Sequence, residues 1–189
     1  MHIGIFGGSF NPVHNGHIAI ARKVVDSGEV DEVWLMVSPL NPFKQHDRLL
    51  DDDLRLAMTR LAVEREQGIV CSDYEFRLPR PSYTWHTLQS LAKDYPNDTF
   101  SLIIGADNWC SFSAWRNNDE IIAGHRIYVY PRTGFPIDRR TLPPGVSVID
   151  MDTIDVSSTE IRRLLHIGED VSDLVPQCIA DMAARLLSD

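Results

Sequence analysis

Cysteine, positive charge and long apolar runs are scarce in this sequence of 189 residues. The three cysteines, Cys71, Cys110 and Cys178, lie far apart and in no Cys-x-x-Cys or Cys/His ligand spacing, which argues against a disulfide framework and a zinc site. No apolar run approaches the ~20 residues that span a bilayer, and no charged and then apolar leader precedes the first predicted strand. These absences argue against a secreted disulfide scaffold and a membrane protein, and they favour a cytoplasmic location.

Basic residues are fewer than acidic ones: 18 Lys and Arg stand against 27 Asp and Glu, a formal net charge of −9 at pH 7. That balance argues against a broad nucleic-acid surface, which needs a basic face. An anionic small ligand would therefore need a locally basic pocket. The chain of 189 residues, 43% of them hydrophobic, is long enough for one well-buried domain and short for two. We therefore predict a single domain over 1–189. The sequence does not indicate an oligomeric state.

Apolar runs typical of buried strands alternate with helical patterns along the chain. Nearly continuous apolar runs predict strands at residues 3–6, 32–38, 69–71, 100–105, 125–130 and 145–149. Apolar residues at helical spacing predict helices that begin near residues 15, 51, 82, 157 and 176, of which three end at Gly28, Gly68 and Gly168. This alternation predicts an α/β fold: a Rossmann-like, doubly wound, mainly parallel sheet with helices on both faces.

The first predicted strand leads into the stretch GGSFNPVHNGH at residues 7–17. A helix that begins at Asn15 or Gly16 places His17 in its first turn and His14 just before it, so both rings can face one oxyanion held over the helix end. In the alternative interpretation both are ordinary loop and helix residues, but a protonated ring at this end would oppose the helix dipole. No G-x-G-x-x-G or Gly-Lys-Ser/Thr pattern is present, so neither a dinucleotide fingerprint nor a P-loop is indicated.

The second predicted strand leads into a proline-stiffened loop, residues 38–46, on the carboxyl edge of the sheet, where ligands bind in open α/β sheets. Lys44 in this loop either neutralises a phosphate or is a solvated lysine, and composition alone favours neither. Asp51, Asp52 and Asp53 crowd the next helix start, where negative charge is favourable, so we interpret them as caps rather than metal ligands. We therefore predict no protein-bound metal.

Two later helix starts add polar groups to that edge. Ser82 or Thr84 is expected to cap the helix that follows a proline-rich loop, and the free amides there make a second anion site. Asp107, after the fourth strand, could cap a helix or bind ribose hydroxyls, and the two roles are compatible. Trp115 belongs to an aromatic series at i, i+3 and i+6 that is typical of packing on a sheet, although one ring could be a stacking platform.

The segment VSSTEIR forms a second signature near the end of the sequence. Ser157 with Glu160 three residues on is a capping box. Capping does not account for Ser158 and Thr159 beside the free amides, nor for Arg162, which would lie one turn later on the same face as Ser158. Two hydroxyls, free N–H groups and a guanidinium suit a triphosphate tail.

Residues 7–17 resemble the signature G-G-[ST]-F-x-P-x-H-x-G-H of the nucleotidyltransferase superfamily, and VSSTEIR resembles the helix start [IV]-S-S-T-x-[IV]-R of its adenylyltransferase branch. Intervening stretches resemble those of bacterial nicotinate-mononucleotide adenylyltransferases in the same order: P-x-x-P-x-K at 39–44, S-Y-T-x-D-T-L at 82–88, G-x-D at 105–107 and the tryptophan at Trp115. His86 stands where the family usually has Asp, and Phe43 where His or Pro is common, so no role is carried onto either.

The resemblance implies transfer of the adenylyl group of ATP to nicotinate mononucleotide, which forms deamido-NAD and pyrophosphate in NAD biosynthesis. The acceptor's own phosphate would be the nucleophile, and Mg²⁺ would be carried by ATP oxygens with few or no protein ligands. The implied residues fall into three groups: catalytic His14, His17, Lys44 and Arg162; ATP-binding Gly7, Gly8, Ser9, Phe10, Gly16, Ser158 and Thr159; and pyridine-nucleotide-binding Tyr83, Thr84, Asp107 and Trp115.

Two other functions stay open at this point. A related transferase that acts on phosphopantetheine or makes a CDP-alcohol would share residues 7–17, but the segment at 82–88 and Trp115 disfavour it. A non-catalytic nucleotide-binding module is disfavoured by the retention of both histidines, Lys44 and Arg162. Release of pyrophosphate would distinguish the enzyme from the module.

Overall fold

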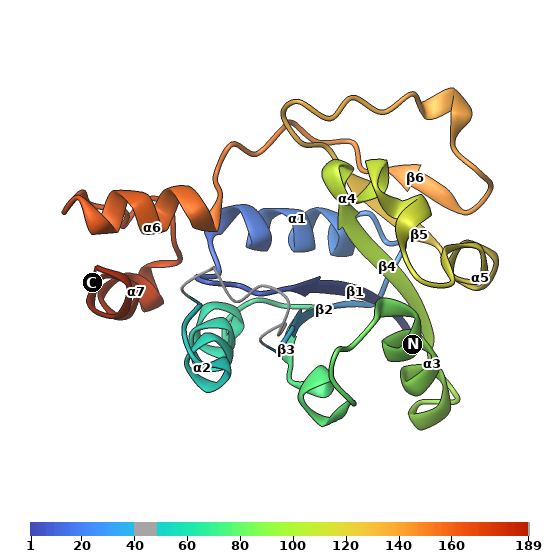
Figure 1. The fold of residues 1–189 in the computed structure, drawn as a ribbon, viewed down its shortest axis with the longest axis horizontal. Helices are drawn as coiled ribbons and strands as arrows, with labels where there is room; N and C mark the ends of the chain where they lie inside the picture. The colour runs from blue at the N-terminus through green and yellow to red at the C-terminus, as the bar shows by residue number, and fades with distance from the viewer. Residues whose placement is uncertain (40–48, 189) are drawn as a thin grey trace.

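The computed structural model describes residues 1–39 and 49–188. In this part of the chain six parallel strands form one sheet in the order β3-β2-β1-β4-β5-β6 (Figure 1). The strands are β1 His2–Gly8, β2 Glu32–Val37, β3 Ile69–Ser72, β4 Thr99–Gly105, β5 Ile127–Tyr130 and β6 Val146–Val148. The strand order reverses between β1 and β4, so a crevice suited to ligands opens beyond their carboxyl ends. The predicted α/β fold with a parallel sheet is confirmed.

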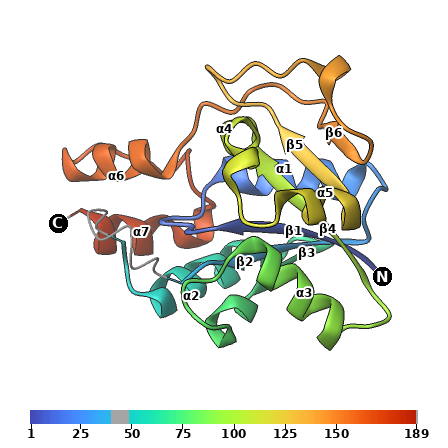
Figure 2. The same ribbon diagram turned by 45° about the vertical axis from the view of Figure 1, so that its right-hand side comes forward.

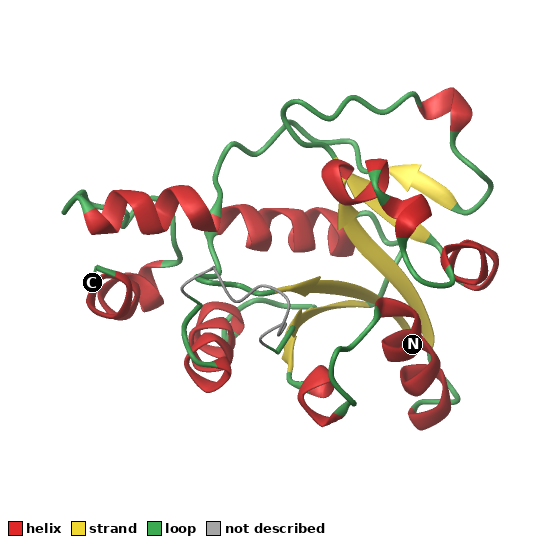
Figure 3. Cartoon of the chain, in the orientation of Figure 1, coloured by secondary structure: helices red, strands yellow, loops and turns green. Residues whose placement is uncertain are grey.

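Helices cover both faces of the sheet, and the turned view shows α1 and α3 on opposite sides of it (Figure 2). The α-helices of the described residues are α1 Asn15–Asp26, α2 Asp52–Val63, α3 Thr84–Asp94, α4 Ala106–Cys110, α5 Asn118–Gly124, α6 Ser158–His166 and α7 Ala180–Leu187. None of them is long and apolar enough to cross a bilayer. Between β5 and α6 the chain is mostly irregular, with β6 and one short helical turn (Figure 3).

Side chains from both faces of the strands are buried. Along β4, Ile103 belongs to a hydrophobic cluster that includes α1, whereas Leu102 and Ile104 belong to a second cluster that includes α3. Because successive strand residues point to opposite faces, a strand that is covered on both faces is apolar throughout. This explains the nearly continuous apolar runs by which the strands were predicted.

The predicted end and apolar stripe of α2 are partly wrong. The helix ends at Val63, before Gly68. The helical spacing of Leu54, Ala57, Met58 and Leu61 predicts that all four face inward, but Leu61 is 42% exposed. Arg55 and Thr59 are fully buried instead. Hydrophobic spacing cannot reveal a buried arginine, because what allows its burial is a set of hydrogen-bond partners from other segments.

Near α3 and α4 the expected cap residue is wrong, one of the two roles considered for Asp107 is excluded, and one helix was not predicted. Tyr83 occupies the N-cap position of α3, and neither Ser82 nor Thr84 caps it; the Ser82 hydroxyl donates to Glu75 at 3.4 Å. Asp107 lies inside the first turn of α4, whose N-cap position is Gly105. The short helix α5 was not predicted at all, because seven residues give too little periodicity for a helix assignment.

Candidate active site

The glycine-rich turn after β1 folds around Phe10. Phe10 is 1% exposed and has φ of +45°, in the left-handed region. A Cβ on Gly8 would lie 3.1 Å from Phe10 Cζ, so a glycine leaves the space that the ring fills. The ring packs edge-on against Phe6 and His17, with centroids 5.9 and 4.9 Å away. The Phe10 side chain supports the turn, so its predicted contact with ATP would come from the backbone.

His14 and His17 lie at the start of α1 as predicted, with His14 at the N-cap position and His17 two residues after Asn15. Their rings stack, with centroids 3.6 Å apart and planes 23° apart. The backbone N–H of His14 donates to Nδ1 of His17 at 3.1 Å. Since Nδ1 accepts, the neutral His17 ring carries its hydrogen on Nε2 and can donate from there. Nδ1 of His14 is buried and has no hydrogen-bond partner in the described protein.

Both imidazoles are held neutral. Burial, and to a smaller extent the positive charge of Arg132, lowers the pKa of His14 to about 3. The pKa of His17 lies well below its usual range. Burial is the largest cause, and the charges of His14 and Arg132 also lower it. A neutral ring does not oppose the helix dipole, so the objection to histidine at this position does not apply. Each ring can donate a hydrogen bond to an anion but is a poor base at neutral pH.

Gly16 allows the close approach of the histidine pair to the helix. A Cβ on Gly16 would lie 2.7 Å from Ile154 Cγ2 and 3.0 Å from His14 Nδ1. The first distance is shorter than real Cβ contacts and the second is unusually tight, so a side chain here would displace Ile154 and His14, and glycine has a packing reason. Its predicted contact with ATP stays a prediction.

The second signature docks on the first. Ser157 caps α6, and its side chain accepts a hydrogen bond from the backbone N–H of Glu160 at 3.1 Å. The Ser158 hydroxyl donates to the carbonyl of Pro12 at 2.9 Å, and the guanidinium of Arg162 donates to the carbonyl of Asn11 at 2.8 Å. The predicted capping residue is confirmed, and two segments nearly 150 residues apart in sequence form one site.

Arg162 also donates to Thr159 Oγ1 at 3.4 Å. A guanidinium has five N–H donors, so donors remain for a ligand after these two bonds. The N-terminal end of α6, its hydroxyls and Arg162 thus lie beside the turn that carries the histidines. These are the groups that the sequence predicted for a triphosphate tail.

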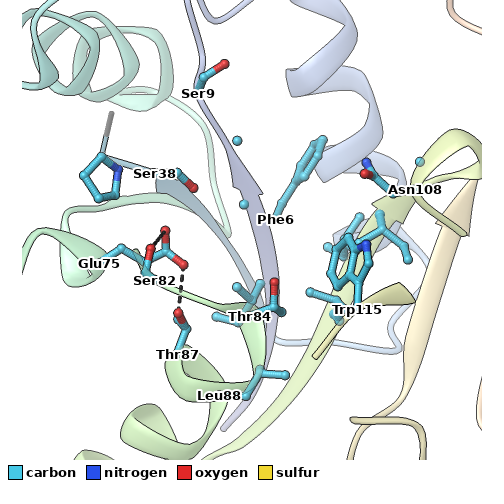
Figure 4. A pocket seen from close by; sticks show the side chains of 18 of the residues that line it. Phe6, Ser9, Ser38, Glu75, Ser82, Thr84, Thr87, Leu88, Asn108 and Trp115 are labelled. Carbon is cyan, nitrogen blue, oxygen red and sulfur yellow. Dashed lines mark hydrogen bonds between the residues drawn. The ribbon is translucent and has the colours of Figure 1, made fainter. Parts of the chain in front are cut away.

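A cavity of about 330 Å³ opens at the carboxyl ends of β1 and β4 (Figure 4). In the close-up, Glu75, Ser82 and Thr87 lie on one side of it, and Trp115 and Asn108 lie on the other. Of the residues predicted to bind ligands, those that line the cavity are Gly7, Gly8, Ser9, Thr84 and Trp115.

Gly7 leaves open space in this cavity. It is an exposed residue of the cavity wall, and a Cβ built on it meets no described atom within 4 Å. Tyr83, by contrast, is 40% exposed and is absent from the cavity lining, and Arg116 lies over its ring at 5.2 Å. The structure therefore brings Thr84 and Trp115 together at one cavity and leaves the Tyr83 ring outside it.

Asp107 lies next to this cavity and pairs with an arginine that sequence reasoning missed. Nε of Arg132 is 3.5 Å from Oδ1 of Asp107, and the guanidinium donates to the Tyr130 hydroxyl at 3.4 Å. The ion pair is too long for a hydrogen bond, so Oδ1 of Asp107 stays without a hydrogen-bond partner in the described protein. A Cβ on Gly105 would lie 2.3 Å from this oxygen, so glycine allows the Asp107 carboxylate to keep this position. The available signal for Arg132 was its place two residues after β5.

Arg55 connects three segments at the carboxyl edge of the sheet. It is completely buried, and it donates to the carbonyls of Ser9 at 2.5 Å, Ser38 at 2.9 Å and Leu50 at 3.1 Å. Its charge is paired with Asp52 at 2.5 Å. Removing it would take a donor away from three carbonyls and one of the cations away from Asp52, so Arg55 supports the turn after β1. No local pattern indicated this role.

Glu75 is a buried carboxyl group in the cavity wall. Thr87 Oγ1 donates to it at 2.8 Å, and Ser82 donates from the loop before α3. Burial raises its pKa, and hydrogen bonds from Thr87, Ser38 and Ser82 oppose that rise. Sequence reasoning did not single out this residue either. It links the end of β2 to the start of α3 across the floor of the cavity.

Lys44 and Phe43 lie outside the described residues, so Lys44 stays a prediction. His86 is half-buried against Tyr83 and Trp85, with ring centroids 5.8 and 5.2 Å away. Within residues 1–39 and 49–188 no group of three or more His, Cys, Asp or Glu residues is arranged to hold a metal ion.

Comparison with known proteins adds a family to this geometry. The family described as "Cytidylyltransferase-like" matches residues 5–164. The chain is 49% identical over 168 residues to the "Probable nicotinate-nucleotide adenylyltransferase" of Bacteroides fragilis, which covers 89% of this chain and 84% of that protein. It is 43% identical over 178 residues to the protein of the same name from Flavobacterium johnsoniae, which covers 93% and 92% of the two chains.

A solved structure gives the same fold. The Plasmodium falciparum nicotinic acid mononucleotide adenylyltransferase complexed with NaAD aligns with a TM-score of 0.82 at 22% identity, over 100% of this chain and 97% of that one. This chain therefore has the fold of that protein.

Proposed function

Because this chain belongs to the family of nicotinate-nucleotide adenylyltransferases, we propose that it transfers the adenylyl group of ATP to nicotinate mononucleotide and forms deamido-NAD in NAD biosynthesis. The observation that carries the proposal is the docking of Ser158 and Arg162 on the turn beside the stacked pair His14 and His17. It gathers two helix starts at one sheet edge, one with two neutral imidazoles and one with hydroxyls and a guanidinium, and these groups suit a polyphosphate.

The transfer needs no protein nucleophile. A phosphate oxygen of the acceptor forms a bond to the α-phosphorus of ATP, the bond from that phosphorus to the bridging oxygen breaks, and its electron pair leaves with pyrophosphate. The acceptor phosphate is already ionised at neutral pH, so no strong base is needed. This chemistry is compatible with the low pKa values of His14 and His17, which make both rings poor bases.

The protein's contribution is then positioning and stabilisation of charge. The N–H donors of His14 and His17 contact the oxygens of the reacting α-phosphate. Arg162, with Ser158 and Thr159, holds the β- and γ-phosphates, and Lys44 assists on the leaving side. Mg²⁺ enters with ATP as part of the substrate and neutralises charge on its phosphate oxygens.

The acceptor binds in the cavity that Thr84 and Trp115 line. The amides at the start of α3 face an anionic group, since the N-terminal end of a helix carries about half a positive charge. Trp115 offers an aromatic face for the pyridine ring. Asp107, whose Oδ1 lacks a hydrogen-bond partner in the described protein, accepts from ribose hydroxyls.

The test is to incubate the purified protein with MgATP and a panel of acceptors: nicotinate mononucleotide, nicotinamide mononucleotide and phosphopantetheine. Products are identified by mass spectrometry, and pyrophosphate is measured by a coupled assay. We expect deamido-NAD and one pyrophosphate per product. ATP binding without pyrophosphate release from any acceptor would refute the enzyme function, and turnover of phosphopantetheine alone would refute the acceptor.

A further inference from the structure

The cavity has an uneven charge distribution in its wall. Among the described residues that line it, the charged ones are Glu75 and Arg80. Glu75 is buried on the floor and receives hydrogen bonds from neighbouring hydroxyls. Arg80 has a side chain that is 47% exposed, so it can meet a ligand that enters from solvent. It is the one basic residue in the described part of the lining.

Arg80 shares its acidic partner with a second arginine. Its guanidinium lies 3.0 Å from Oδ2 of Asp52, while the other oxygen of the same carboxylate is 2.5 Å from the guanidinium of Arg55. Two guanidinium groups thus share one carboxylate, so these three side chains together carry one positive charge. Arg55 is completely buried and bound to three backbone carbonyls, which anchors Asp52 and, through it, Arg80 at the cavity.

The start of α3 adds positive charge to the same side of the cavity. Ser82 and Thr84 follow Arg80 closely in sequence and also line the cavity. The N-terminal end of α3 brings partial positive charge to the wall, and the Glu75 carboxyl group in the same wall is already engaged by the hydroxyls of Thr87 and Ser82. An anionic group on a ligand is therefore favoured on this side of the cavity over a neutral group of the same shape.

We propose that Arg80 is the specificity-determining residue that makes the protein prefer an acceptor with a carboxylate over one with a carboxamide. The inference rests on the proposed function, because it assigns the pyridine end of the acceptor to this cavity. The two mononucleotides share ribose and phosphate and differ in the charge of one substituent. A guanidinium attracts the carboxylate through its charge and can bind it through two N–H donors, while a carboxamide gains neither.

The experiment compares kcat/KM for nicotinate mononucleotide and nicotinamide mononucleotide at saturating MgATP. For Arg80→Gln we expect the value for the acid to fall about fivefold to tenfold, because a partly exposed charged contact is lost, and the value for the amide to change less than about twofold. Arg80→Lys keeps the positive charge but not the paired N–H donors of the guanidinium, so it should retain part of the preference for the acid that Arg80→Gln loses. The matched control is Arg77→Gln, since Arg77 is 69% exposed, pairs with Asp73 and is absent from the cavity lining.

Ionic strength gives a second readout. The Debye length falls from about 10 Å at 0.1 M salt to about 3 Å at 1 M, so the preference of the wild type for the acid should weaken as salt is added over that range. Because the phosphate is common to both acceptors, the ratio of the two kcat/KM values isolates the effect on the carboxylate. In Arg80→Gln this ratio should be nearly independent of salt.

Equilibrium binding of the two mononucleotides, measured by calorimetry without ATP, separates this inference from the proposed function. A preference for the acid that Arg80→Gln removes supports the inference even if no turnover is seen, in which case only the proposed function fails. Equal weakening of both mononucleotides would overturn it, because Arg80 would then contact the shared phosphate. An unchanged ratio in a folded Arg80→Gln protein would also overturn it and leave Arg80 as a surface ion pair with Asp52.

Discussion

Gly7 offers a way to test where the substrates lie without disturbing the fold. It is exposed in the wall of the cavity, its backbone does not need the left-handed region, and a Cβ added to it meets no described atom within 4 Å. Gly7→Ala should therefore fold as well as the wild type. Alanine even restricts the unfolded chain, which stabilises proteins by about 0.4 to 1 kcal/mol at compatible sites.

The same methyl group should obstruct the ligand. It is about as large as a water molecule, whose share of liquid volume is ~30 Å³, so it fills about a tenth of the 330 Å³ cavity. A ligand that packs against the bare backbone of Gly7 must move by roughly 1 Å, and a misplacement of that size can reduce the rate by about 100-fold. We expect an unchanged or slightly higher melting temperature and a kcat/KM that is 10- to 100-fold lower.

Two other glycines serve as controls in the same assays. Gly124→Ala, at the end of α5, also adds a methyl group where no described atom lies within 4 Å, and it should leave activity unchanged with an unchanged or slightly higher melting temperature. Gly8→Ala would push a methyl group to 3.1 Å from the Phe10 ring, so it should lose stability and activity together. If Gly7→Ala melts normally and retains its kcat/KM within twofold, no substrate approaches Gly7 and the proposed location of the site is wrong.

Three further predictions concern the histidines and Arg162. His17→Ala should fold but lose at least ~100-fold in turnover, the usual effect of removing one preorganised donor to an oxyanion; near-normal turnover would exclude His17 from the reaction centre. Arg162→Ala should raise the KM for ATP, and it should also lower stability because Arg162 donates to the Asn11 carbonyl. Arg162→Lys should restore only part of the ATP affinity. Lower stability with an unchanged KM for ATP would show that Arg162 is purely structural. The free energy of unfolding should fall as pH is lowered from about 6.5 towards 3, because His14 and His17 have depressed pKa values and bind protons on unfolding. Urea titrations measure this free energy at each pH. If it changes with pH as steeply in His14→Gln as in the wild type, the prediction is contradicted.

The sequence predicted those parts of the site whose determinants are local. The position of His17 relative to the start of α1 follows from helix geometry once Asn15 or Gly16 is taken as the first residue, and the structure begins α1 at Asn15. Ser157 as the cap of α6 follows from the spacing to Glu160, and this too is confirmed. The sequence predicted phosphate-binding groups in both signatures but not the hydrogen bonds by which α6 contacts Asn11 and Pro12.

The parts that the sequence did not predict depend on partners brought together by the fold. Arg55 is spaced like a core residue of α2, but its burial is possible only because carbonyls from three other segments accept its N–H donors. Glu75 is buried because hydroxyls from the loop before α3 and from α3 reach it. Arg132 acquires its role from Asp107 and Tyr130, which lie on a neighbouring helix and on β5. None of these contacts leaves a periodic signal along the chain.

The arrangement of charge explains how a protein with a net charge of −9 can attract two polyanionic substrates. Its two imidazoles at the start of α1 are neutral, so under the proposed function they would add hydrogen-bond donors at the reacting phosphate without the penalty that buried cations would suffer. The positive charge lies instead on Arg80, Arg132 and Arg162, each partly open to solvent. The charge of Arg132 also lowers the pKa values of His14 and His17, which helps to keep both imidazoles neutral. Removing that charge should therefore raise the pKa of His14, which would be visible in an imidazole titration by NMR of Arg132→Gln.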